Sequence, residues 1–204
     1  MISKVFEDIA KPKRQPFLVV APTSVATNWL SESKKFAPAL KTVLITQTGK
    51  KSGKTLIEQI DGADIVITSY TLLRIDFDSY SDTAKLNWAG MFLDEAQFIK
   101  NHQSKSYQCV RKLSAPFKLA MTGTPIENNL MELWALFSVT SPGLFGGPKK
   151  FVDVYKKPIE KDQDQEKLKQ IRRRVRPLLL RRTKEQVVKE LPPKIEQVLE
   201  LQLN

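Results

Sequence analysis

Cysteine and histidine are almost absent from this sequence of 204 residues, which contains one of each, Cys109 and His102. A single cysteine excludes an internal disulfide, and these two residues are too few for a metal site built from cysteine and histidine. The lack of a disulfide framework favours a reducing compartment, either the cytoplasm or a nucleus. We therefore interpret Cys109 and His102 as structural or solvent-facing residues.

Long apolar runs are missing as well. No run approaches the roughly 20 residues that a membrane-spanning helix needs. The first residues, MISKVFEDIAKPKRQ, lack the apolar centre of a secretory signal. The hydrophobic fraction of 41% is nevertheless sufficient for a core. The composition therefore predicts a globular domain with no membrane partner.

Acidic residues are too few to balance the basic ones, and the net charge is +11. Residues 156–194 alone hold 14 Lys and Arg against 6 Asp and Glu. A basic region of this kind is typical of proteins that bind a polyanion, most often nucleic acid. A solvated, charged helix without a ligand explains the same pattern, and the charge alone leaves both interpretations open.

Five short apolar runs, separated by helix-like stretches, follow one another in the first two thirds of the chain. They are FLVVA (17–21), VLIT (43–46), DIVIT (64–68), MFLD (91–94) and KLAMT (118–122). Short, continuously apolar strands that alternate with helices indicate a parallel sheet covered on both faces. The fold class predicted here is α/β.

The pattern changes after residue 122. TPIENNLMELWALF predicts a helix, with Thr124 at the N-cap, Pro125 at the first position and Glu127 completing a capping box. The Gly- and Pro-rich stretch SPGLFGGP (141–148) then predicts a boundary. We expect residues 1–140 to form the sheet domain and residues 141–204 a helical, basic appendage.

An acidic pair directly follows the fourth apolar run, in MFLDEAQ. Ligands of parallel α/β sheets bind beyond the carboxyl ends of the strands. There, Asp94 could hold Mg²⁺ and Glu95 could orient or deprotonate an attacking water. Taken alone, the pair is better explained by carboxylates that open a helix.

A polar turn follows the fifth apolar run. Thr122, Gly123 and Thr124 stand between KLAM and the next helix-like stretch. Their hydroxyl groups could sense a γ-phosphate or link a nucleotide site to a nucleic-acid site. An ordinary strand-to-helix turn accounts for the same residues.

Five segments in order carry a resemblance to a known family: APTSVATNWLSESKKFAP, ITSYTLLR, LDEAQFIKN, LAMTGTPIENNLMELWALF and LLRRTKEQVVKELPPK. Together they strongly resemble the Swi/Snf-type family of helicase-like, DNA-translocating ATPases, over roughly residues 17 to 204. The resemblance implies a RecA-like parallel sheet flanked by helices, followed by a helical protrusion and a basic linker toward a second lobe. It also implies ATP and Mg²⁺ as cofactors and double-stranded DNA as partner.

The resemblance assigns roles residue by residue. Asp94 and Glu95 match the Walker B acids, with Asp94 as the metal ligand, and Gln97 stands where many members have His. Thr122, Gly123 and Thr124 match a motif that couples the nucleotide state to DNA. Further positions match motifs that contact nucleic acid: Pro22, Thr23, Ser24, Ser69, Tyr70, Arg181 and Arg182.

The stretch TQTGKKSGKT (46–55) is nearly a phosphate-binding loop. The pattern G-x-x-x-x-G-K-[ST] requires a glycine at position 48, which is Thr48, so the loop is one residue short. In the family, the phosphate loop also precedes the segment that matches VVAPTSV. We therefore interpret GKKSGKT as a basic surface turn. Because no other phosphate loop is present, we expect a first lobe without its Walker A loop, and a chain that alone neither binds ATP tightly nor hydrolyses it.

Other function classes are less consistent with these segments. An RNA helicase of the same superfamily and a non-catalytic DNA-binding scaffold remain alternatives, whereas a small phosphate-loop kinase fails on loop length. DNA-bound proteins are further expected partners. A sheet without its central loop-bearing strand would expose an edge and apolar surface, which favours self-association. We expect a nucleoid-associated cytoplasmic protein if the source is bacterial, and a nuclear one if it is eukaryotic.

Overall fold

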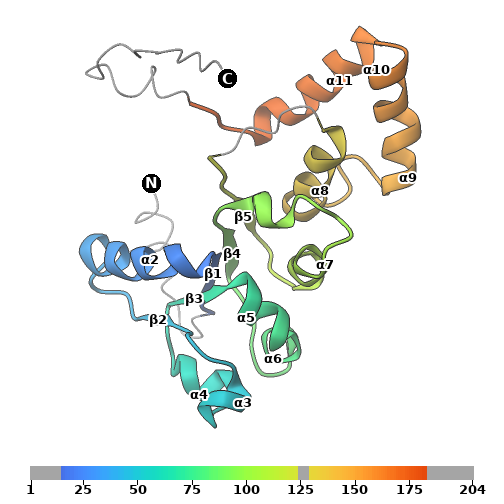
Figure 1. The fold of residues 1–204 in the computed structure, drawn as a ribbon. Helices are drawn as coiled ribbons and strands as arrows, with labels where there is room; N and C mark the ends of the chain where they lie inside the picture. The colour runs from blue at the N-terminus through green and yellow to red at the C-terminus, as the bar shows by residue number, and fades with distance from the viewer. Residues whose placement is uncertain (1–14, 124–128, 183–204) are drawn as a thin grey trace, which may run out of the picture. The chain divides into compact units, whose positions relative to one another are not determined.

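The computed structural model describes residues 15–123 and 129–182 (Figure 1). Contacts along the chain divide it into two compact units, Met1–Lys157 and Pro158–Asn204. Within the described ranges, no helix has the length and apolar character needed to cross a membrane.

The first unit contains a parallel sheet of five strands in the order β2-β3-β1-β4-β5 (Figure 1). The strands are β1 (Phe17–Ala21), β2 (Thr42–Leu44), β3 (Ile65–Ser69), β4 (Gly90–Leu93) and β5 (Lys118–Ala120). Every neighbouring pair is parallel. The predicted α/β class is therefore confirmed, and each of the five apolar runs forms a strand.

Helices follow nearly every strand of this unit. They are α2 (Thr23–Phe36), α3 (Gly49–Ser52), α4 (Leu56–Ile60), α5 (Tyr70–Ile75), α6 (Phe77–Ser81), the 3₁₀-helix η1 (Ala96–Ile99), α7 (Lys105–Lys112), α8 (Leu130–Thr140), α9 (Pro148–Phe151) and the π-helical η2 (Val152–Lys156). The helix α10 (Lys157–Lys161) follows η2 directly. The second unit then contains α11 (Gln165–Val175) and the 3₁₀-helix η3 (Arg176–Leu178).

Alternate residues of the central strands face the two layers of helices. Val19 and Ile67 belong to a core cluster with Ala26 and Trp29 of α2, so this face is covered by α2. Thr68, the next residue of β3, is buried on the other face, where its hydroxyl bonds the Tyr80 hydroxyl of α6 at 2.8 Å. Both faces of the middle strands are thus buried, which explains why these strands are apolar throughout.

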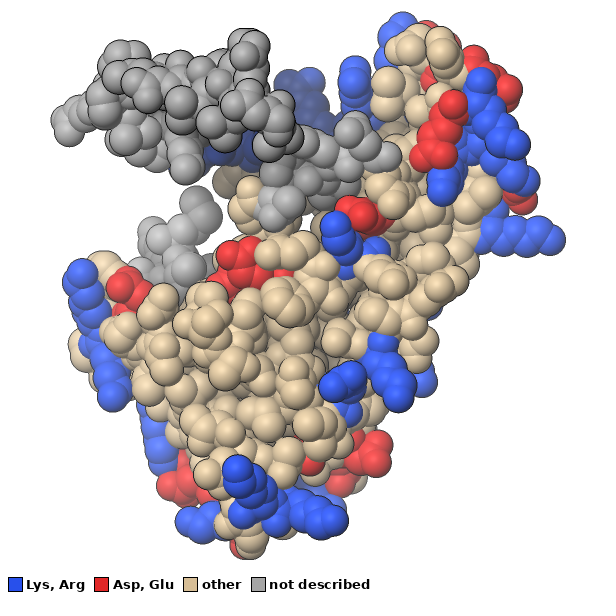
Figure 2. All heavy atoms as spheres, viewed as in Figure 1, with Lys and Arg blue, Asp and Glu red and all other residues tan. Residues whose placement is uncertain are grey.

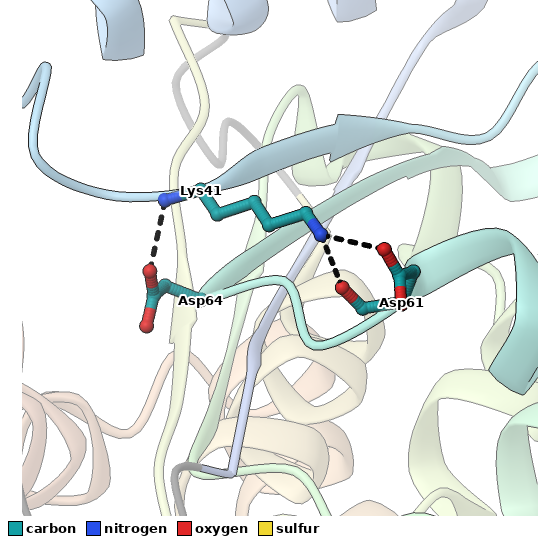
Figure 3. Close-up of polar contacts among 3 residues, drawn as sticks. All are labelled: Lys41, Asp61 and Asp64. Atoms are coloured by element: carbon teal, nitrogen blue, oxygen red, sulfur yellow. Dashed lines mark hydrogen bonds and ion pairs between the residues drawn. The ribbon is translucent and has the colours of Figure 1, made fainter.

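The edge strand β2 is held in register by three residues at its start (Figure 3). The backbone N–H of Lys41 donates to the carboxylate of Asp64 at 2.8 Å. The Lys41 ammonium donates to the Asp61 carboxylate at 2.8 Å and also to the Asp61 carbonyl. Hydrogen bonding to Lys41 lowers the pKa of Asp61. These contacts fix the edge strand at the end of the sheet opposite to the carboxyl ends.

The helix that was predicted to start at Thr124 begins instead at Leu130. Asn129 has an extended backbone, and its side chain accepts from the N–H of Met131 at 2.9 Å. Asparagine is among the best N-cap residues, and its extended conformation separates α8 from what precedes it. Residues 124–128, which include the predicted capping box, lie outside the described residues.

The first compact unit continues past the expected boundary at residues 141–148. Phe145 packs against Phe137 of α8, with ring centroids 6.1 Å apart, and against Phe151 and Tyr155 at 5.3 and 5.7 Å. Phe145, Phe151 and Tyr155 are buried. This aromatic cluster attaches the residues up to Lys157 to α8, although their sequence is rich in glycine and proline before residue 149.

The described part of the second unit is helical, as expected for the appendage. Asp164 caps α11 by accepting from the N–H of Lys167 at 3.0 Å. Three arginines, Arg172–Arg174, occupy the last turn of α11, where positive charge suits the helix dipole. The apolar run IEQVLELQL at the end of the chain lies outside the described residues.

Candidate active site

The backbone of Asp94, Glu95 and Ala96 connects the ends of three strands. The N–H of Asp94 donates to the carbonyl of Val20 in β1 at 2.9 Å, and the N–H of Ala96 donates to the carbonyl of Met121 after β5 at 2.8 Å. Glu95, between them, has φ 47° and ψ 55°, the left-handed region. For a residue with a side chain this conformation costs about 1–2 kcal/mol. The hydrogen bonds on either side maintain it, and such strain is common at functional sites.

The side chain of Asp94 is held at both oxygens. Its Oδ2 accepts from Nε1 of Trp29 in α2 at 2.8 Å, and its Oδ1 accepts from the N–H of Glu95 at 2.8 Å. A carboxylate has about four acceptor positions, so two remain for other partners. Asp94 is half-buried. The carboxylate is therefore oriented by the protein and still able to bind a cation or water.

Tyr70, the first residue of α5, supports Asp94. Its hydroxyl donates to the backbone carbonyl of Asp94 at 2.8 Å, and its ring is stacked on Phe98 with centroids 5.3 Å apart. Burial, and then the nearby charges of Asp94 and Glu95, raise the pKa of Tyr70. The hydroxyl therefore stays neutral and acts as a donor.

Gln97 connects Glu95 to Thr122. Its Nε2 donates to Glu95 Oε2 at 2.7 Å, and its Oε1 accepts from Thr122 Oγ1 at 2.9 Å. A carboxylate can only accept, so the amide has one orientation that satisfies this partner. Thr122 and Gly123 are exposed, and Thr124 lies outside the described residues. The structure thus joins Glu95, Gln97 and Thr122 through two hydrogen bonds, and their catalytic and coupling roles stay predictions.

The predicted nucleic-acid residues divide into exposed and buried ones. Thr23 and Ser24 are exposed in the first turn of α2, directly after β1, and Pro22 at its N-cap provides no side-chain cap. Ser69, the last residue of β3, and Tyr70, the first of α5, are 6% and 4% exposed. Ser69 Oγ accepts from the N–H of Leu72 at 3.2 Å, so it caps α5. The hydroxyl groups of Ser69 and Tyr70 are therefore engaged within the protein.

Two further predicted residues belong to the other compact unit. Arg181 and Arg182 are exposed after η3. They lie in the second compact unit, whereas the sheet belongs to the first.

The GKKSGKT stretch forms two short capped helices after the edge strand β2. Thr48 caps α3 by accepting from the N–H of Lys51 at 3.2 Å, and Gly53 ends α3 with φ +69°. The N–H of Gly49 donates to the Asp76 carboxylate at 2.7 Å. Thr55 forms a capping box with Glu58. The amides are therefore used within the stretch or directed at a carboxylate, as expected for a surface turn, and basic side chains gather over α3 and α4 (Figure 2).

The residues at the sheet edge fit a magnesium ion that is shared with phosphate and water. Carboxylate oxygens are the ligands that Mg²⁺ prefers, and the ion usually keeps several waters. Within residues 15–123 and 129–182, no group of three or more His, Cys, Asp or Glu side chains could hold a metal. Asp94 would therefore supply only part of the coordination, which is the usual arrangement in nucleotide sites.

His102 and Cys109 lie outside this edge. The His102 ring is edge-on to Trp134 at 5.6 Å and to Tyr107 at 6.4 Å, which is a packing role. Cys109 is half-buried, and burial raises the pKa of its thiol. Neither residue contributes to the candidate active site.

Sequence reasoning missed Trp29. Trp29 lies in a stretch that the sequence predicts as helix-like, and no role was assigned to it there. The only signal was that a tryptophan in a helix after β1 could reach the carboxyl end of the adjacent strand β4. A bond between residues 65 positions apart cannot be derived from local spacing.

The chain has extensive similarity to known proteins. A family model described as SNF2-related domain matches residues 1–204. The chain is 40% identical over 187 residues to the putative ATP-dependent helicase/translocase YwqA of Bacillus subtilis, and the match covers 91% of this chain and 20% of that protein. It is 38% identical over 193 residues to the TATA-binding protein-associated factor MOT1 of Saccharomyces cerevisiae, covering 89% of this chain and 10% of that protein.

A solved structure is similar as well. The SWI2/SNF2 ATPase core of Sulfolobus solfataricus in complex with dsDNA matches with a TM-score of 0.78 and 34% identity, over 94% of this chain and 39% of that chain. The chain thus spans a fifth of the bacterial relative's length and less than half of the archaeal structure. Its five-stranded sheet has the RecA-like fold of that ATPase core. With a family model matched over its full length, the chain belongs to the family of SNF2-related domains.

Proposed function

We propose that this chain is part of a motor that hydrolyses ATP and translocates along double-stranded DNA. The observation that carries the proposal is the connection Glu95–Gln97–Thr122, at the same sheet edge from which α2 presents its exposed first turn. The archaeal ATPase core, which matches 94% of this chain, has been solved in complex with dsDNA.

In this proposal, Asp94 would hold the nucleotide's magnesium ion. Its two bonds, from Trp29 and from the Glu95 N–H, keep the carboxylate oriented before the ion binds. When bound, Mg²⁺ would offset the negative charge that develops on the transferred phosphate. The protein would contribute orientation, because its dipoles are already in place before the nucleotide binds.

Glu95 orients or deprotonates the attacking water. Its Oε2 is bonded to Gln97, so the position of the carboxylate depends on where Gln97 lies. Gln97 in turn accepts from Thr122, the first residue of the proposed coupling turn Thr122–Gly123–Thr124. A displacement of that turn would therefore change the position of Glu95, which is how the DNA and nucleotide states would be coupled.

On the DNA side, Pro22, Thr23 and Ser24 would contact the phosphate backbone with hydroxyl groups and first-turn amides. Such contacts position a protein on DNA without reading its sequence. Ser69 and Tyr70 would act through backbone groups or by shaping the surface, because their hydroxyls are bonded internally. Arg181 and Arg182 would add phosphate contacts from the linker that follows the protrusion, residues 141–204 in our proposal.

Two alternatives have less support. An RNA helicase would share the same edge, but the similar solved core is bound to dsDNA. A non-catalytic scaffold would have no chemical need for a carboxylate that is oriented at both oxygens and linked to a second, strained glutamate. We keep DNA-bound proteins as further partners, since one relative is named a TATA-binding protein-associated factor.

Self-association is a further part of the proposal. Within the described residues, β5 pairs with β4 alone. Phe117 and Leu119, at this edge, are 43% and 38% exposed. An open strand edge with apolar side chains favours association with another chain. Sedimentation velocity over a range of concentrations tests this, and a Leu119→Thr variant should be more monomeric.

The decisive experiment measures ATP hydrolysis by the whole protein with duplex DNA, with RNA and without nucleic acid. Stimulation by the duplex and not by RNA supports the proposal, and Glu95→Gln should abolish it. Equal stimulation by RNA favours the RNA helicase. Absence of hydrolysis together with duplex binding favours the scaffold.

A further inference from the structure

Trp29 belongs to the helix whose first turn is the proposed DNA contact, and it is bonded to the proposed metal ligand. It lies in α2, six residues after the exposed Thr23, and its Nε1 donates to Asp94 Oδ2 at 2.8 Å. At about 1.5 Å per residue, Trp29 and Thr23 are roughly 9 Å apart along the helix axis. The indole ring is half-buried and packs on the core cluster that contains Val19 and Phe92. A single rigid side chain therefore connects the helix that begins at the proposed DNA contact with the proposed metal ligand.

The chemistry of the indole group suits a fixed connection. Its N–H is only a donor and does not titrate, so the bond is maintained over the whole physiological pH range. A hydrogen bond to a charged group is stronger than one between neutral groups. Because Trp29 has two side-chain torsions and is packed against the sheet, α2 cannot rotate or slide without moving the bond. The Asp94 carboxylate must then reorient or lose one of its two donors.

The other two tryptophans provide a comparison within the same chain. Trp88 donates to the carbonyl of Tyr80 at 2.9 Å, and Trp134 donates to the carbonyl of Gly146 at 3.0 Å. Both are 2% exposed and their bonds satisfy backbone carbonyls, which is a structural role. Trp29 differs because it is more exposed and its acceptor is a carboxylate at the candidate active site.

We propose that Trp29 is a positioning residue that transmits duplex-backbone binding at the start of α2 to the Asp94 carboxylate. The inference rests on the proposed function, since it takes the phosphate backbone of duplex DNA as the ligand of α2. DNA phosphates that bind at Thr23 and Ser24 displace the first turn of α2. The hydrogen bond from the Trp29 indole then moves the Asp94 carboxylate. Binding of DNA and orientation of the metal ligand are then linked through one hydrogen bond.

The first test compares Trp29→Phe with the matched control Trp88→Phe in the whole protein. The rate of ATP hydrolysis is measured against duplex concentration, which separates maximal stimulation from the concentration that gives half of it. Loss of a charge-assisted bond predicts that Trp29→Phe lowers the maximal stimulation about tenfold. The half-stimulating duplex concentration should stay within about twofold, because the phosphate contacts at Thr23 and Ser24 are retained. Trp88→Phe should change neither quantity.

A second measurement needs no turnover. The three indole N–H groups of the ¹⁵N-labelled chain give separate NMR signals, which single Phe variants assign. Addition of a short duplex should shift the Trp29 signal and leave those of Trp88 and Trp134 in place. A Trp29 signal that stays in place while the duplex binds overturns the inference.

The outcomes distinguish the two levels of the proposal. If the unmodified protein shows no stimulation by duplex DNA, the proposed function is wrong. If it is stimulated and Trp29→Phe is stimulated equally, only the role of Trp29 is wrong. If Trp29→Phe and Trp88→Phe lose stimulation to the same extent, the effect is one of folding, and the positioning role is rejected.

Discussion

The hydroxyl of Tyr70 donates to the backbone carbonyl of Asp94 at 2.8 Å, so a residue predicted to contact DNA is bonded to the residue predicted to hold the metal. Tyr70 is 4% exposed, and its ring is stacked on the more exposed Phe98. The contact places the tyrosine beneath the active edge and not on its surface. Tyr70 should therefore affect DNA binding only indirectly.

Replacing Tyr70 by Phe should cost about 1 kcal/mol of unfolding free energy, because the buried carbonyl of Asp94 loses a neutral donor. Duplex affinity should change little.

Thr23→Ala combined with Ser24→Ala should weaken duplex binding and leave the stability nearly unchanged, because both hydroxyls are exposed. Urea unfolding and fluorescence anisotropy with a labelled duplex measure the two effects. A large loss of affinity for Tyr70→Phe would indicate a direct contact.

Replacing Gln97 by Met should uncouple hydrolysis from DNA, because Met has a similar length but bonds neither Glu95 nor Thr122. We expect duplex stimulation of the whole protein to fall about tenfold, the effect of losing one charge-assisted bond. Thr122→Val removes the second bond of the same connection. The double variant should then be little worse than Gln97→Met alone, since linked residues are not additive. Additive losses in this cycle would mean that the two residues act separately.

Glu95 should be replaceable by glycine at a gain in stability, although not in activity. Its φ of 47° is strained for any residue with a Cβ atom. Glu95→Gly should therefore be more stable than Glu95→Ala by about 1 kcal/mol. Both should be inactive, because both lack the carboxylate. Chemical unfolding of the two variants gives the difference, and equal stabilities would show that the backbone relaxes when Glu95 is removed.

Lys118 should make the stability depend on pH in the alkaline range. Its ammonium donates to the carbonyls of Val110 and Arg111 at the end of α7, at 2.9 and 3.2 Å. Burial, and then the charge of Arg111, lower the pKa of Lys118 to about 8. In the unfolded chain a lysine has a pKa of about 10.4. Between these values the unfolded state binds the extra proton, so folding is favoured increasingly as the pH rises.

A Lys118→Met variant isolates this contribution. The stability of the unmodified chain relative to the variant should rise between pH 8 and about 10.4 and be constant below this window. Thermal or urea unfolding at several pH values measures it. A difference that falls with increasing pH would mean that the two carbonyls hold the ammonium in its charged form.

Calorimetry with Mg-ATP tests the GKKSGKT stretch. The Gly49 amide is bonded to Asp76 and Thr55 caps α4, so neither is arranged for phosphate. We expect no tight binding to this chain alone and no difference for Lys54→Ala. Binding that is lost in Lys54→Ala would make the stretch a working phosphate loop.

The sequence predicted the sheet well because each strand is a continuous apolar run that is buried on both faces. The helix-like stretch between the first two apolar runs is α2, which begins after Pro22 and ends at Phe36. Sequence reasoning placed the start of α8 wrongly, since the capping signal at Thr124 was preferred to the asparagine at position 129. The boundary at SPGLFGGP stays a prediction, although the ring contacts of Phe145 with Phe137 and Tyr155 cross this stretch. Such ring contacts have no signature in local composition.

The residues of the site were predicted by motif, whereas their connections were not. The resemblance named Glu95, Gln97 and Thr122, and the structure adds the order in which they are bonded. Trp29 was missed because its partner lies on another strand. The left-handed backbone of Glu95 could not be foreseen either, since it results from two hydrogen bonds to β1 and to the end of β5.

The hydrogen bonds of Lys41 with Asp61 and Asp64 have a practical consequence. They anchor the edge strand independently of the segment that follows, and that segment is closed by its own caps at Thr48 and Thr55. Gly53, between these caps, is exposed, and an added Cβ atom would meet nothing within 4 Å. Residues 52–54 are therefore a suitable place to attach a fluorophore or insert a peptide tag, outside the candidate active site.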